Sequence, residues 1–101
     1  MLYRAPEPPA VSEAEAARIQ RRHLSFLEAM HARGVMLAAG PFRDQPDQRW
    51  RGLCVYLVPP DEARALAEQD PAVVAGRLSF EVIEWLTPQG QLGSGRRELP
   101  G

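Results

Sequence analysis

The chain of 101 residues lacks several features that would place it in a functional class. Its single cysteine, Cys54, excludes an intrachain disulfide and fits a reducing compartment. No apolar run approaches the roughly 20 residues that span a bilayer, and residues 1–10 have no apolar segment typical of a signal peptide. We therefore expect a soluble cytoplasmic protein without a membrane partner.

The sequence also has little net charge and lacks common ligand-binding motifs. The formal net charge of −1 argues against a nucleic-acid partner, because such proteins carry a basic surface. The only two histidines, His23 and His31, do not form an HxxxH spacing, and no CxxC occurs, so we expect no metal site. A glycine-rich phosphate loop is also missing, and we expect no cofactor.

The residues that are present form an ordinary globular mixture, 45% hydrophobic and 25% charged, of a length that suits one domain. Residues 2–4 predict a short edge strand, which the prolines at 6, 8 and 9 end. Ser12 and Glu15 form a capping box, and apolar residues then recur every three or four positions. This pattern predicts a helix over 13–33, ended by Gly34 in the left-handed region.

Strands over 35–42, 50–58 and 78–87 and helical segments over 61–69 and 71–75 complete the pattern. The order β-α-β-β-α-β predicts an α+β, ferredoxin-like fold, with a four-stranded antiparallel sheet covered by helices on one face. Both alternating faces of residues 53–58 are apolar, so we expect a second copy to cover the open face in a homodimer. Residues 1–88 form the predicted domain, and residues 89–101 a flexible tail.

Three stretches, in order, resemble the YCII-related (YciI-like) family of the dimeric α/β-barrel superfamily. They are Arg-His-Leu-Ser-Phe-Leu at 22–27, Gly-Val-Met-Leu-Ala-Ala-Gly-Pro at 34–41, and the Glu-Ala, Asp-Pro and Ala-Gly pairs within 62–76. The resemblance covers about residues 20–87. It implies a dimeric barrel with a cleft in which His23 and Asp70 form an acid–base pair. A few such relatives act on small cyclic or aromatic-derived compounds, by elimination or isomerisation.

The two candidate catalytic residues also have structural interpretations. His23 lies on the apolar helix face, four positions from both Ile19 and Leu27. It is either a core histidine bonded to a backbone carbonyl or a general acid–base group. Asp70 precedes Pro71 and is either a helix N-cap or the partner that orients His23. A carboxylate has enough acceptor sites to do both.

The end of the strand at 35–42 predicts a pocket mouth. We expect Gly40, Pro41 and Phe42 to contact a small organic molecule there, although Gly40-Pro41 also ends the strand and Phe42 also suits hydrophobic cover. The arginines around residues 43–51 are expected to be solvated surface. The preferred function is a cofactor-independent lyase or isomerase, and the alternatives are a ligand-binding module without chemistry and an interaction domain.

Overall fold

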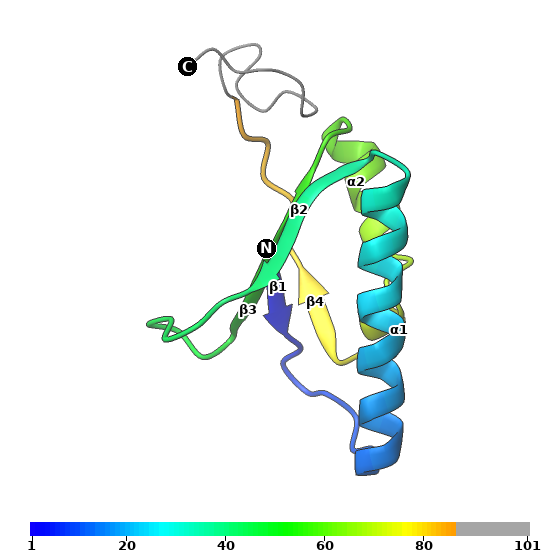
Figure 1. Cartoon of the computed structure of the whole chain (residues 1–101). Helices are drawn as coiled ribbons and strands as arrows, with labels where there is room; N and C mark the ends of the chain where they lie inside the picture. Colours follow the sequence, from blue (N-terminus) through cyan, green and yellow to red (C-terminus); the bar gives the residue numbers. More distant parts are fainter. Residues whose placement is uncertain (87–101) are drawn as a thin grey trace.

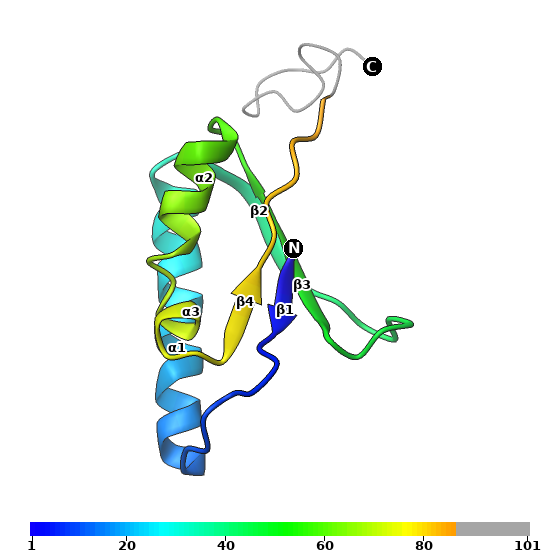
Figure 2. The same cartoon turned by 180° about the vertical axis from the view of Figure 1, so that it is seen from behind.

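The computed structural model describes residues 1–86, so the predicted tail at 89–101 lies outside the described residues. Four strands form one antiparallel sheet in the order β2-β3-β1-β4. All helices cover the same face of this sheet, and the loop between β2 and β3 projects away from them (Figure 1, Figure 2). The predicted α+β, ferredoxin-like arrangement is confirmed. The elements are β1 (Leu2–Arg4), α1 (Glu13–Ala32), β2 (Met36–Pro41), β3 (Trp50–Tyr56), α2 (Pro60–Ala67), α3 (Pro71–Val74) and β4 (Leu78–Phe80).

Helix α1 begins and ends where the sequence predicts. The Ser12 side chain accepts a hydrogen bond from the Glu15 backbone N–H at 3.1 Å. The Glu15 carboxylate pairs with Arg18 at 2.8 Å instead of reaching back to the cap. Gly34 follows the helix with φ of +82°, a conformation that favours glycine. This start and end fix the helix phase, which decides the face that is buried.

Strand β1 lies between β3 and β4, so the prediction of an edge strand is wrong. Leu2 pairs with Gly52 on one side and with Phe80 on the other. The prolines that suggested an edge all follow Arg4, the last paired residue, so they remove no hydrogen bond from the sheet. The strand is short, but its position is interior.

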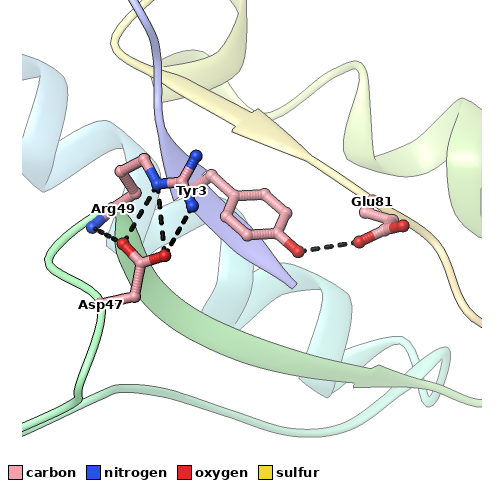
Figure 3. A network of polar contacts seen from close by, with 4 residues as sticks. All are labelled: Tyr3, Asp47, Arg49 and Glu81. Atoms are coloured by element: carbon pink, nitrogen blue, oxygen red, sulfur yellow. Dashed lines mark hydrogen bonds and ion pairs between the residues drawn. The ribbon is translucent and has the colours of Figure 1, made fainter.

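The last strand is shorter than predicted, because β4 ends at Phe80 and residues 81–86 have no regular structure. The backbone N–H of Glu81 donates to the Met1 carbonyl at 3.0 Å. The Tyr3 hydroxyl also donates to the Glu81 carboxylate at 2.7 Å (Figure 3). Within residues 1–86, the segment after Glu81 forms no backbone hydrogen bond with a strand, although its pattern is apolar.

The core lies between the helices and the sheet face that they cover. Met30, Met36 and Leu66 are its buried centre, and Cys54 and Tyr56 of β3 pack against it. The alternate residues of β3 face the other way, and of these Leu53 is 44% exposed. The open face of the sheet is therefore apolar and uncovered in the single chain. No helix within residues 1–86 combines the length and apolar character needed to span a membrane.

Candidate functional site

A buried pair of side chains, His23 and Asp70, joins two segments that are 47 positions apart. The His23 Nδ1 atom lies 2.7 Å from Asp70 Oδ2 and 2.9 Å from Asp70 Oδ1. Only 7% of His23 and 3% of Asp70 is exposed to solvent. The prediction that these residues lie within hydrogen-bond reach is confirmed.

Local structure positions both side chains. His23 shares the buried stripe of α1 with Ile19 and Met30, as the three-and-four spacing predicts. Asp70 is the N-cap of α3, with an extended backbone that Pro71 favours. Its Oδ1 accepts a hydrogen bond from the Ala72 backbone N–H at 2.8 Å. The carboxylate therefore has both predicted contacts, one with the cap and one with the imidazole.

The pairing decides which imidazole nitrogen carries the proton. An ionised carboxylate can only accept hydrogen bonds, so the His23 Nδ1 must be the donor. In a neutral ring, Nε2 then holds a lone pair. Within residues 1–86, no side chain or backbone group forms a hydrogen bond with this Nε2. It is the nitrogen left for a ligand.

A cavity of about 540 Å³ lies between α1 and the sheet, and His23 lines it. The predicted contact residues Gly40, Pro41 and Phe42 line the same cavity, so the structure brings these four residues together. Asp70 does not line this cavity. It lines a second one of about 530 Å³, bounded by β3, α2 and residues 80–85. Asp70 is therefore connected to the first cavity through its contact with His23.

The strands beside the cavity meet closely at Gly52, which sequence reasoning did not single out. A Cβ atom at Gly52 would lie 2.7 Å from the carbonyl oxygen of Gly40 on the neighbouring strand. At Gly40 itself, an added Cβ would meet nothing within 4 Å. A glycine inside a strand pattern is the signal that marks such a close approach. Phe42 lines the cavity, and its ring is tilted against that of Trp50, with ring centroids 6.4 Å apart.

Three arginines, Arg4, Arg51 and Arg77, also line the cavity, and the sequence analysis assigned no site role to them. Arg51 is exposed, as expected for that region, yet it also borders the cavity. Arg4 follows Leu2 by two positions on β1, so both side chains lie on the helix-covered face. Strand alternation could have placed Arg4 there, whereas Arg77 comes next to it only through the fold.

Two titratable groups of β3, Cys54 and Tyr56, are neutral at physiological pH. Burial raises the pKa of the Cys54 thiol from 9.0 to about 11. Burial also raises the pKa of Tyr56 above its ordinary value. Residues 1–86 contain no group of three or more His, Cys, Asp or Glu side chains placed to hold a metal ion. The described lining of the cavity thus combines an imidazole held by a carboxylate with three arginines.

The described chain is a small α+β domain with a ferredoxin-like sheet that helices cover on one face. A buried histidine–aspartate pair lies between its two cavities. The chain belongs to the YCII-related domain family, whose model matches residues 1–86. This confirms the family predicted from the three ordered stretches, and it is consistent with the dimeric α/β-barrel superfamily. No curated protein matches the chain.

Proposed function

We propose that this protein is a cofactor-independent enzyme that moves a proton on a small organic molecule, in a lyase or isomerase reaction. His23 is the acid–base group, and Asp70 is the residue that orients it. One observation carries the proposal: His23 lines a cavity of about 540 Å³ while its Nδ1 is held by a buried carboxylate. This arrangement keeps the second nitrogen free to exchange protons.

The proposed reaction starts with a substrate C–H bond that a neighbouring carbonyl makes acidic. His23 Nε2 takes the proton, and the C–H electron pair shifts toward the carbonyl. Asp70 stabilises the imidazolium that forms, as a buried carboxylate does in hydrolytic triads. The imidazolium then returns the same proton to another atom of the substrate, which is an isomerisation. Alternatively the electron pair expels a leaving group, which takes the proton from His23 Nε2 as it departs, and this is an elimination. Gly40, Pro41 and Phe42 contact the substrate.

A second candidate is a module that binds a small molecule without chemistry. It is favoured by the bond from the Ala72 backbone N–H to Asp70, because this bond gives the carboxylate a structural use independent of catalysis. An interaction domain that uses the surface and not the cavity is the third class. In the first class His23 transfers a proton to or from a bound ligand, in the second it only lines the binding cavity, and in the third no ligand binds in the cavity.

The test separates binding from proton transfer. Small cyclic ketones, lactones and hydroxylated aromatic compounds are screened by thermal shift, and the binders are incubated with the protein in D2O. NMR then follows replacement of carbon-bound hydrogen by deuterium. We expect exchange with the wild-type chain and its loss in His23→Gln, which still binds the compound. Binding without exchange would favour the second candidate, and the absence of any binder would favour the third.

We further propose a homodimer formed through the open face of the sheet. Leu53 and Leu57 of this face are 44% and 38% exposed in the single chain, although both are large apolar residues. Contiguous apolar surface of this kind is unusual on a monomer. A second copy that packed sheet against sheet would cover it and leave the helix-side cavity open.

A further inference from the structure

The cavity beside His23 is lined by charges of one sign. Its three arginines, Arg4, Arg51 and Arg77, are called here the cavity arginines. No aspartate or glutamate of residues 1–86 lines the same cavity. An unbalanced cluster of positive side chains around a hollow creates a potential that attracts anions. The charge of the lining therefore constrains what the cavity binds.

The cavity arginines differ from their neighbour Arg49. The Arg49 guanidinium donates three hydrogen bonds to the Asp47 carboxylate, the shortest of them 2.6 Å long (Figure 3). Arg49 also holds the pKa of Asp47 below its usual value. The side chains of the cavity arginines form no ion pair or hydrogen bond with any group in residues 1–86. Their donors are therefore available to a ligand.

Backbone hydrogen bonds place the cavity arginines at the same end of the sheet. The Ala5 N–H, next to Arg4, donates to the carbonyl of Arg77 at 3.1 Å. The Arg4 N–H donates to the carbonyl of Arg49, two positions before Arg51, at 2.7 Å. Arg4 and Arg51 lie on β1 and β3, and Arg77 lies in the bend directly before β4. The backbone pairing of these segments therefore holds the three positions at one end of the sheet.

The rest of the cavity is largely apolar on the side of α1. Ile19, Leu24 and Leu27 line it beside His23. A ligand that satisfied this lining would have an apolar body and one anionic group. We propose that the cavity selects small organic anions, carboxylates above all, with the charged group at the cavity arginines and the apolar body beside His23. This inference deepens the proposed function, on which it rests for the chemistry at His23.

The expected preference for carboxylates follows from the match between a guanidinium and a carboxylate. A guanidinium presents a planar fork of donors that fits a carboxylate, and such charge-assisted hydrogen bonds are stronger than neutral ones. A neutral amide of the same shape keeps the apolar contacts but loses this charge. We therefore expect a carboxylate to bind about tenfold tighter than its amide isostere, the ratio that one charge-assisted bond contributes.

The probes are benzoate, its neutral isostere benzamide, and acetate, which has the charge without the apolar body. Binding to the full chain is followed by NMR through the backbone amides of Gly40, Gly52 and Phe42. We expect benzoate to bind most tightly and to weaken as salt is added, because salt screens the attraction. Benzamide should be insensitive to salt. Benzamide binding as tightly as benzoate would overturn the inference, as would undetectable benzoate binding in the millimolar range.

The variants Arg4→Gln and Arg77→Gln each remove one cavity charge. We expect both to weaken benzoate binding several-fold and to leave benzamide binding unchanged, with Arg4→Lys recovering part of the loss. The matched control is Arg64→Gln, because Arg64 pairs with Asp61 on α2 and does not line the cavity. Unchanged benzoate binding in both cavity variants would contradict the inference.

The outcome for this inference is separable from that for the proposed function. If the carboxylate preference is absent but His23-dependent deuterium exchange occurs, the anion selectivity fails and the enzyme proposal stands. If the preference depends on Arg4 or Arg77 but no bound compound exchanges hydrogen, the selectivity stands and the enzyme proposal fails.

Discussion

Both carboxylate oxygens of Asp70 contact His23, but the two oxygens differ in the other hydrogen bonds that they form. Oδ1 lies 2.9 Å from His23 Nδ1 and also 2.8 Å from the backbone nitrogen of Ala72. Oδ2 lies 2.7 Å from the same Nδ1, and it forms no other hydrogen bond within residues 1–86. Oδ1 thus contacts both the imidazole and the N-terminus of α3, while Oδ2 contacts the imidazole alone. Substitutions at Asp70 can separate the helix cap from the bond to the imidazole.

The first prediction concerns stability at Asp70. Asp70→Ala removes the cap of α3 and leaves the buried His23 N–H without an acceptor, which together cost about 2–4 kcal/mol of unfolding free energy. Asp70→Asn keeps an oxygen for the Ala72 N–H and is expected to cost about 1 kcal/mol, since asparagine caps helices as well as aspartate. Urea unfolding of both variants measures this. Equal losses would mean that neither the cap nor the bond to His23 contributes to stability.

The second prediction uses two neighbouring glycines. Gly52→Ala places a methyl group against the Gly40 carbonyl oxygen, so the β2–β3 pairing must shift, at a cost of about 1–3 kcal/mol. Gly40→Ala meets open space and serves as the matched control, with an expected change within about 0.5 kcal/mol. Thermal unfolding of the two variants tests this difference. A harmless alanine at position 52 would contradict the close approach of the strands.

The third prediction tests the proposed homodimer. Leu53→Lys with Leu57→Lys places charges on the open sheet face, and we expect this double variant to be monomeric in micromolar solution. Val74→Lys is the control, because Val74 is 72% exposed on α3, away from that face. Light scattering measures the mass. A stable dimer through this face should bury at least about 1,000 Å². A wild-type monomer, or a double variant that stays dimeric, would rule out the proposed interface.

The fourth prediction concerns alkaline pH. Burial raises the pKa of Cys54 to about 11, against 9.0 without burial, so the folded chain keeps its thiol proton after the unfolded chain has lost it. This contribution to stability is complete below pH 9.0 and is lost as the pH rises toward 11. Burial also raises the pKa of Tyr56, so its contribution to stability is likewise lost as the pH rises. Urea unfolding from pH 8 to pH 10 measures the decline.

Cys54→Ala is the comparison for that series, and its stability should fall less steeply over the same range. Thiol labelling gives an independent measure. A pKa of about 11 instead of 9.0 lowers the thiolate fraction at neutral pH roughly a hundredfold, so labelling of the folded chain should be slow. Labelling at the rate of an unfolded peptide would show that the thiol is accessible.

Much of the fold follows from local signals in the sequence. Ser12 and Gly34 mark the ends of α1 because caps and left-handed glycines act through their nearest neighbours. The limits of β4 could not be predicted in the same way. Residues 81–86 have an apolar pattern, but a strand also requires a partner, and the last bond to β1 is at Glu81. Pairing is a property of the assembled sheet.

In the candidate site too, residues marked by local signals could be predicted, whereas contacts made by the fold could not. Helix periodicity predicts the buried face for His23, and the proline after Asp70 predicts a helix N-cap there. The pairing of these two residues was implied by the resemblance to the YCII-related family and not by a local signal. The cavity that His23 shares with Gly40 follows from the topology. The cluster of cavity arginines could not be predicted from sequence, because Arg77 in the bend before β4 meets Arg4 and Arg51 only when β1, β3 and β4 have paired. Charge clusters built from distant segments have no linear pattern.

The central claim is that Asp70 fixes the proton of His23 on Nδ1 and leaves Nε2 as the base. In Asp70→Asn, the oxygen that caps Ala72 is kept and an amide NH2 replaces Oδ2. This NH2 donates to Nδ1 and moves the ring proton to Nε2. Nitrogen-15 NMR of the neutral His23 ring reports the tautomer directly.

We predict Nδ1–H in the wild-type chain and Nε2–H in Asp70→Asn, with deuterium exchange lost in the variant. A wild-type ring protonated on Nε2, or the same tautomer in both proteins, would contradict the account.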